Sequence, residues 1–287
     1  MSDPLHSYIG LDGLRRYRVG DRRLLSVTSV LSLAPAPELA AWKTSRALRA
    51  AFDRRHDLAA IQDDETADRD RLLAWCAEQP NTIAAEAADR GTRAHEAAAV
   101  SWVTTTETDD REVRPFQRRF REQVELWGVE QVAVEASVAN LTYGYAGSAD
   151  LVARVPALAA AITGDPEALG LIDIKTGAVR PSAALQIAAY ANAEHVIGTH
   201  GQLRPMPPVK WGAVLHLRPR KSSWYPVQIG KGSFTAFLRV LQMAHTQVSD
   251  ESRIGPRLFV PDEVNEAVSE WLQPVNDDPF DLTEEEK

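Results

Sequence analysis

The chain has 287 residues, of which 44% are hydrophobic and 25% charged, and its formal net charge is −8 at pH 7. This composition is typical of a globular protein with a real core and excludes a largely disordered chain. Cys76 is the only cysteine, which excludes a disulfide framework and any thiolate-held zinc or iron–sulfur cluster within one chain. No apolar run approaches the roughly 20 residues of a membrane span. We therefore expect a cytoplasmic protein with no membrane partner.

The periodicity of apolar residues predicts a helical first half and a mixed centre. In chain order we predict a strand at 24–27, helices at 37–55, 66–79, 82–103 and 114–127, a strand at 132–138, a turn at 140–144 and a partner strand at 145–155. A loop with a short helix at 156–169, a strand at 171–175, a helix at 182–197, strands at 209–217 and 224–229, and helices at 234–247 and 262–271 follow. The expected fold class is α/β (α+β), with a central mixed β-sheet flanked by helices.

The charges are unevenly distributed along the chain. Between Ile174 and Ser249 the only acid is Glu194, and the acids collect instead at 63–70 and 277–286. The bases of this stretch are Lys175, Arg180, Arg204, Lys210, Arg218, Arg220, Lys221, Lys231 and Arg239. Two interpretations stay open, a solvated surface and a surface that binds a polyphosphate. The candidates for contact with DNA phosphates are Arg180, Lys210, Arg218, Arg220 and Lys221.

An acid and a lysine share one face of a predicted strand. Asp173 and Lys175 are two residues apart in Asp-Ile-Lys-Thr-Gly, so their side chains point the same way, while Ile174 points to the other face. On a neighbouring strand Asp150 can lie nearly opposite Asp173, where facing Cβ atoms are about 5 Å apart. Two carboxylates at that distance can share one Mg²⁺ or Mn²⁺ ion. The bound ion would lower the pKa of a coordinated water, and Lys175 would orient that water.

Further polar residues could support this pair. Gln186 and Tyr190 are four apart and lie on one face of the helix predicted at 182–197, with Glu194 a further turn along. His95, in the helical segment Gly91-Thr92-Arg93-Ala94-His95, is a candidate metal ligand, and its alternative is a structural histidine. Glu135 is a weaker candidate ligand, and its alternative is a surface acid.

One glycine precedes the first of these acids. In Gly147-Ser148-Ala149-Asp150 we expect Gly147 to permit close approach of a DNA backbone or a neighbouring strand.

The order of these motifs resembles the PD-(D/E)XK nuclease superfamily, in its branch of RecB-like and phage exonucleases. The resemblance covers residues 27–190 and implies a restriction-endonuclease-like core with a helical N-terminal elaboration. It also implies metal ligation by His95, Asp150, Asp173 and the backbone carbonyl of Ile174, with Lys175 as the catalytic lysine and Gln186 and Tyr190 in support. The cysteines that hold an iron–sulfur cluster in several relatives are missing, which favours the cluster-free phage type.

We expect three parts in the chain. These are a helical N-terminal part over 1–130 that contributes His95, a nuclease core over 131–275, and an acidic, disordered tail over 276–287. The tail segment 276–280 is similar to the acidic, Phe-ended tip by which single-strand-binding proteins recruit partners, but it is internal and lacks the terminal carboxylate, so a solubilising tail is the favoured interpretation. A recombinase or a single-strand-binding protein is a further candidate partner beside DNA.

The leading hypothesis is a Mg²⁺- or Mn²⁺-dependent DNA exonuclease serving recombination, repair or replication in a bacterium or phage. The first alternative is a DNA-binding or assembly module of the same fold without turnover. The second is a glycosidase that uses Asp150 and Asp173 as acid and base, which explains neither Lys175 nor the basic stretch.

Overall fold

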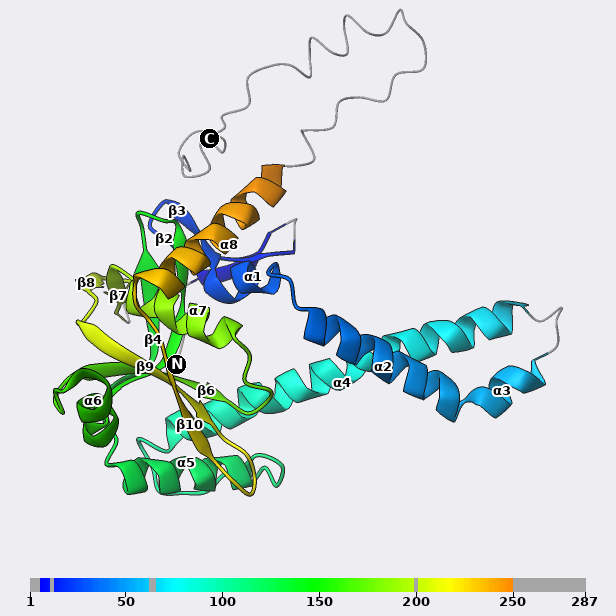
Figure 1. Cartoon of the computed structure of the whole chain (residues 1–287), viewed down its shortest axis with the longest axis horizontal. Coiled ribbons are helices and arrows are strands. Elements are labelled where there is room, and N and C mark those ends of the chain that lie inside the picture. The colour runs from blue at the N-terminus through cyan, green and yellow to red at the C-terminus, as the bar shows by residue number, and fades with distance from the viewer. Residues whose placement is uncertain (1–5, 11–12, 62–65, 199–200, 250–287) are drawn as a thin grey trace, which may run out of the picture. The chain divides into compact units, whose positions relative to one another are not determined.

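The computed structural model describes residues 6–10, 13–61, 66–198 and 201–249. Over these residues a mixed sheet of ten strands is flanked by helices, which confirms the expected α/β class (Figure 1). The chain divides into two compact units. The first comprises 1–34, 122–217 and 222–287, and the second comprises 35–121 and 218–221. The helix predicted at 262–271 and the tail at 276–287 lie outside the described residues.

The sheet of the first unit is built around β5. The strands are β1 (His6–Ile9), β2 (Arg15–Val19), β3 (Arg22–Ser26), β4 (Glu130–Asn140), β5 (Tyr145–Arg154), β6 (Leu169–Lys175), β7 (His195–Ile197), β8 (Leu203–Pro205), β9 (Val209–His216) and β10 (Ser223–Val227). β4 and β5 form a long antiparallel hairpin, closed by the turn expected at 140–144. One half of β5 also pairs with β3, and the other half pairs with β6. β6 then runs parallel to β9, and β10 pairs with β9 as an edge strand.

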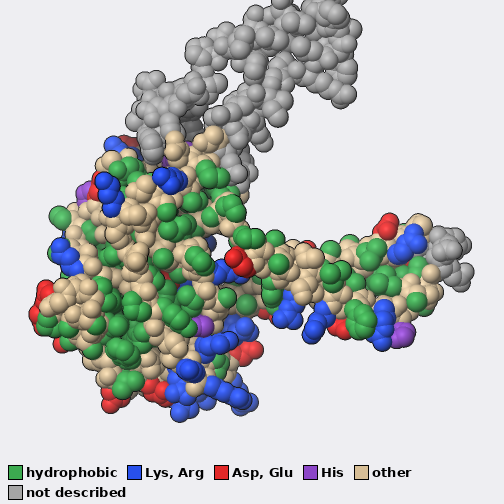
Figure 2. Space-filling model, in the orientation of Figure 1, with side chains coloured by type: hydrophobic (Ala, Val, Ile, Leu, Met, Phe, Trp, Pro, Cys, Tyr) green, Lys and Arg blue, Asp and Glu red, His purple; other side chains and the backbone are tan. Residues whose placement is uncertain are grey.

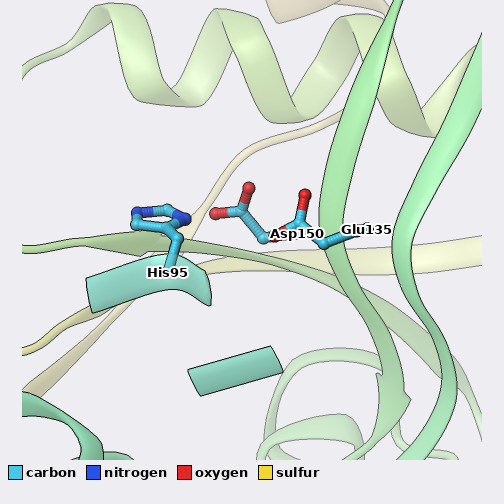
Figure 3. A group of neighbouring side chains, drawn as sticks. All are labelled: His95, Glu135 and Asp150. Atoms are coloured by element: carbon cyan, nitrogen blue, oxygen red, sulfur yellow. The ribbon is translucent and has the colours of Figure 1, made fainter. Parts of the chain in front are cut away.

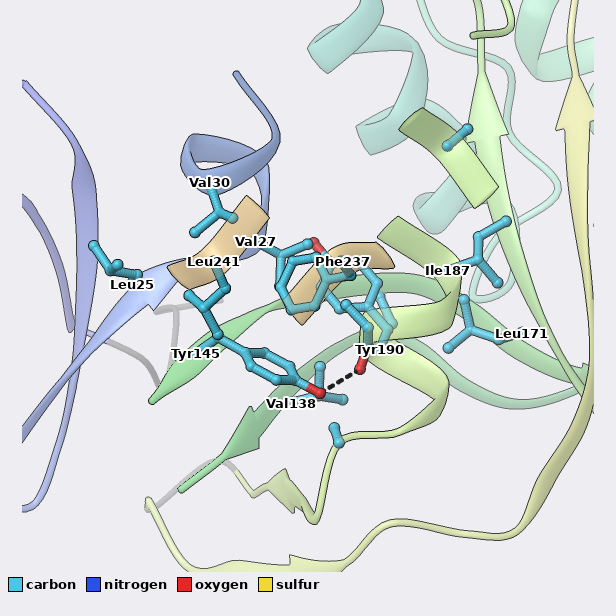
Figure 4. Packing of buried hydrophobic residues seen from close by; sticks show 14 of the residues in the cluster. Leu25, Val27, Val30, Val138, Tyr145, Leu171, Ile187, Tyr190, Phe237 and Leu241 are labelled. Atoms are coloured by element: carbon cyan, nitrogen blue, oxygen red, sulfur yellow. Dashed lines mark hydrogen bonds between the residues drawn. The ribbon is translucent and has the colours of Figure 1, made fainter. Parts of the chain in front are cut away.

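Three helices pack together beside this sheet. They are α1 (Val27–Ser32), α7 (Ser182–Ala191) and α8 (Lys231–Ser249), and α7 contacts β5, β6 and β9. The core between them holds Val138, Tyr145, Leu171, Ile187 and Phe237, all fully buried (Figure 4). The Tyr145 hydroxyl donates a hydrogen bond of 2.8 Å to the carbonyl of Ala189, which satisfies the one polar atom of that ring. α6 (Pro156–Thr163) packs against β9.

The second unit is helical. It holds α2 (Pro37–Asp53), α3 (Arg55–Ala60), α4 (Thr66–Val100) and the first part of α5 (Arg114–Trp127). α2 packs along α4, and the Lys43 ammonium donates to Asn81 Oδ1 at 2.9 Å. The predicted break between helices 66–79 and 82–103 is wrong, because α4 continues through Pro80. Proline removes one helical hydrogen bond, yet the helix continues, and Pro80 is buried.

The helix predicted at 182–197 is wrong in its second half. α7 ends at Ala191, and residues 195–197 form β7, which pairs with β4. Two contacts from the β4–β5 turn hold the chain in this path. Asn140 Nδ2 donates to the Asn192 carbonyl at 3.0 Å, and the Glu194 carboxylate accepts the amides of Leu141 and Thr142 at 2.8 and 3.2 Å. Glu194 therefore secures a turn and is not part of the polar face of α7. The short elements β1, β2, α1, α3 and β8 were not predicted.

Candidate metal centre

The candidate site lies where β5 and β6 separate. The antiparallel register pairs Leu151 with Ile172, and one further step places Asp150 opposite Asp173. No backbone pair forms at that step, and instead the amide of Ile174 donates to Asp150 Oδ2 at 2.6 Å. One oxygen of Asp150 is therefore held by the backbone of β6, next to Asp173.

Glu135 lies opposite Asp150 on the other neighbouring strand. The β4–β5 register pairs Val134 with Leu151 and Ala136 with Ala149, which leaves Glu135 facing Asp150. One carboxylate oxygen of Glu135 lies within 4.8 Å of one of Asp150 (Figure 3). Ser148 Oγ donates to the Glu135 carboxylate at 3.2 Å. Glu135 was the weakest of the expected ligands, yet the structure places its carboxylate next to that of Asp150.

The backbone of Glu135 is strained. Its φ of 47° is the only positive value for a residue other than glycine in the described part of the chain. A left-handed conformation costs a residue with a side chain roughly 1–2 kcal/mol. Such strain persists only where the surrounding structure holds it in place, and it is concentrated at functional sites. Nothing in the local sequence predicts this conformation, because Glu135 is not one of the residue types that commonly adopt a positive φ.

Lys175 is held between the strand and α7. Its ammonium donates to Asp173 Oδ1 at 2.9 Å and to Gln186 Oε1 at 3.2 Å. The Asp173 side chain is 2% exposed, whereas that of Lys175 is 29% exposed. The lysine therefore reaches the surface with its tip fixed by an acid and an amide. Ile174, between the two, buries its side chain on the opposite face.

Tyr190 lies one turn after Gln186 on α7 and is 2% exposed. Burial raises the pKa of Tyr190 well above its ordinary value, and the negative charges of Asp150 and Asp173 raise it further. The phenol is therefore protonated at neutral pH and can act as a hydrogen-bond donor beside the acids.

Gly147 makes room for the ring of Tyr190. A Cβ at this position would lie 2.7 Å from Tyr190 Cε1 and from its hydroxyl oxygen. The close approach is therefore that of an aromatic ring, and not the DNA backbone or neighbouring strand expected from the sequence.

Within the first unit the structure thus brings together six expected residues. They are Glu135, Asp150, Asp173, Lys175, Gln186 and Tyr190. His95 is half-buried on α4, in the second unit.

The acidity of Asp150 gives a stability test. Burial raises the pKa of Asp150 from 3.8 to about 6, and Lys175 and the Ile174 amide oppose the shift. Because the pKa of Asp150 is raised in the folded state, its carboxyl contributes stability below pH 3.8, and this contribution is lost as the pH rises through about 6. Asp150→Asn should therefore be more stable than the wild type at pH 7 in EDTA, by roughly 1–2 kcal/mol.

Urea unfolding at pH 4 and pH 7 measures this difference. At pH 4 the two proteins should be nearly equal in stability. At pH 7, saturating Mg²⁺ should raise the free energy of unfolding of the wild type only. A wild type as stable as the variant at pH 7 in EDTA would contradict the raised pKa.

The expected DNA-contacting bases are exposed. Arg180 precedes α7, and Lys210 lies on β9. Arg218, Arg220 and Lys221 lie in the β9–β10 connection, and the Arg119 guanidinium on α5 donates to the carbonyls of Pro219 and Arg220 at 3.5 and 3.2 Å. Lys and Arg side chains gather on the surface around this connection (Figure 2).

No described helix combines the length and apolar character that crossing a membrane requires. No protein-family model and no curated protein matches the sequence. Among solved structures, the chain is similar to one described as "Crystal structure of SSO0001", with 13% identity over 87% of this chain and 85% of that one. The TM-score of that match is 0.29, so the likeness carries no weight for the fold or the function.

Proposed function

We propose that this protein is a divalent-metal-dependent DNA nuclease, and specifically an exonuclease acting on linear DNA in recombination, repair or replication. The observation that carries the proposal is the placement of Asp150 between Glu135 and Asp173, next to a lysine held by Asp173 and Gln186. Three acids with one lysine on adjoining strands suit phosphodiester hydrolysis better than a purely structural role. We place this activity in the cytoplasm of a bacterium or of the host of a phage.

The donor set fits a hard cation. Carboxylate oxygens are preferred ligands of Mg²⁺ and Mn²⁺, and two neighbouring buried carboxylates repel one another unless a proton or a cation is bound. Burial raises the pKa of Asp150 to about 6, and a bound cation would favour its charged form. The proposed ligands in the first unit are Glu135, Asp150, Asp173 and the backbone carbonyl of Ile174. The resemblance adds His95 as a further proposed ligand.

When bound, the cation supplies Lewis-acid polarisation of the phosphate and lowers the pKa of a coordinated water. The protein contributes the positioning. Asp173 and Gln186 hold the Lys175 ammonium in one place, where it can donate to the attacking water or to a phosphate oxygen. Tyr190 keeps its proton and packs on Gly147, which fixes the α7 end of the site against β5.

The exposed bases provide the attraction for DNA. Arg180 and Lys210 in the first unit and the three bases of the β9–β10 connection offer ammonium and guanidinium groups to phosphates. Binding through such contacts weakens steeply with added salt, so the ionic strength of every assay must be fixed.

The direct test is cleavage of purified DNA. We expect the protein to degrade linear double- or single-stranded DNA with Mg²⁺ or Mn²⁺, to be inactive in EDTA, and to leave covalently closed circles intact. Cleavage that resists EDTA would overturn the proposed chemistry. Binding of DNA without cleavage under any divalent ion would show instead a DNA-binding module of the same fold.

A further inference from the structure

The face of the sheet that carries Asp173 and Lys175 continues over two more strands. β6 and β9 pair Lys175 with His216 and Asp173 with Val214, and β9 and β10 pair Val214 with Tyr225. Paired residues of neighbouring strands point to the same face of a sheet, and residues two apart on one strand do so as well. His216 and Tyr225 therefore lie on the face of Asp173 and Lys175.

The distances across the sheet suit an extended ligand. Neighbouring strands lie about 4.8 Å apart, so His216 is one strand and Tyr225 about two strands, or roughly 10 Å, from the acid and lysine of β6. The two rings are 6.3 Å apart between centroids and tilted by 44°. They form a pair beside the catalytic lysine, on strands whose connection carries three further bases.

The helical cover of this face ends before Tyr225. Around Gly212 the face is closed by Ile187 of α7 together with Val227 and Ile229, whose methyl carbons lie 2.6–3.2 Å from where a Cβ of Gly212 would be. Two residues from Val227 along β10, Tyr225 is 45% exposed, and four residues beyond Gly212 on β9, His216 is half-buried. An aromatic ring is therefore presented to solvent at the border of the site.

The opposite face of the same strands gives the contrast. Trp224 points away from the site, and its ring centroid lies 5.6 Å from that of Trp127. Its indole nitrogen donates a hydrogen bond of 2.9 Å to Gln123 Oε1. That aromatic residue has a structural role. Tyr225, its neighbour, is exposed on the side of the acids.

We propose that His216 and Tyr225 form the binding surface for an unpaired strand of DNA next to the scissile phosphate. Tyr225 stacks on a base, and His216 donates from its imidazole to a phosphate beside the one that Lys175 contacts. Stacking needs a base whose face is free, so the substrate at the point of cleavage is single-stranded. This inference rests on the proposed nuclease function and specifies its substrate.

Binding of a fluorescein-labelled 12-nucleotide oligo-dT, followed by anisotropy in EDTA at fixed ionic strength, tests the surface without cleavage. Base–aromatic stacking contributes about 1–3 kcal/mol per base, so Tyr225→Leu should weaken binding by roughly 5- to 150-fold. Tyr225→Phe keeps the ring and should bind like the wild type. His216→Ala should lower the affinity for oligo-dT several-fold. Phe52→Leu, which changes an aromatic residue 63% exposed on α2, should leave that affinity unchanged.

A blunt 12-base-pair duplex is the comparison ligand, and its affinity should be unchanged in Tyr225→Leu. Binding of oligo-dT by Tyr225→Leu within twofold of the wild type, or an equal loss on the duplex, would overturn the proposed surface. The two proposals can fail separately. If the wild type cleaves no DNA but Tyr225→Leu still binds oligo-dT more weakly than the wild type, the proposed nuclease activity is wrong and the proposed binding surface stands.

Discussion

Replacing Asp173 by alanine is expected to lower the rate of DNA cleavage by roughly 10²–10⁴-fold, and Lys175→Ala by about 10²–10³-fold. Asp173 is buried against the ammonium of Lys175, so its loss removes a proposed metal ligand and also releases the lysine. Lys175→Ala keeps the acids but removes the donor that Asp173 and Gln186 hold in place. Single-turnover cleavage of a labelled linear DNA at saturating Mg²⁺ measures both effects.

Two matched variants separate chemistry from surface charge. Glu130→Ala removes an exposed acid from β4, and Lys231→Ala removes an exposed base from the start of α8. Both should cleave within about twofold of the wild type, because substitutions away from buried contacts change little. Because Lys175→Ala leaves the buried Asp173 without its ammonium neighbour, thermal unfolding of each variant must accompany the assay. Cleavage by folded Asp173→Ala or Lys175→Ala at the wild-type rate would rule out the assigned site.

Gly147→Ala is expected to destabilise the protein by about 1–3 kcal/mol, because an added methyl group would overlap a buried ring. The contact atoms of Tyr190 would lie 2.7–3.0 Å from the new Cβ, well inside van der Waals contact. Tyr190 is packed in the core with Val138 and Ile187, so it has little room to move. Any shift would also move α7, which carries Gln186, so we expect cleavage to fall together with stability. Urea unfolding at pH 7 measures the change.

Gly177→Ala is the matched control, because it lies just after β6 with open space around its Cβ position. Its stability should stay within about 0.5 kcal/mol of the wild type. A double-mutant cycle with Tyr190→Ala identifies the cause. When the ring is absent, Gly147→Ala should cost less than about 1 kcal/mol, and an undiminished cost would show that the strain arises elsewhere.

Some elements of the fold could be predicted from local sequence patterns. The helix at 114–127 and the turn at 140–144 match the structure, and the central strands match it to within a few residues, because each follows from periodicity or turn chemistry over a few neighbouring positions. The residue at which α7 ends could not be predicted in this way. Asn140 and Glu194 hold the segment that leads into β7 through contacts across 52 and 53 positions of sequence, and no local pattern predicts these contacts.

Two relations within the site follow from local geometry alone. Asp173 and Lys175 share a face of one strand, and Gln186 and Tyr190 lie one turn apart on one helix. The other relations depend on how distant segments pair. Strand pairing places Asp150 opposite Asp173 and Glu135 opposite Asp150, and packing of α7 sets the ring of Tyr190 on Gly147. Strand pairing also extends the face of Asp173 and Lys175 to His216 and Tyr225. Strand register and ring packing arise from the pairing of distant segments, where a shift of one residue would turn every side chain to the opposite face.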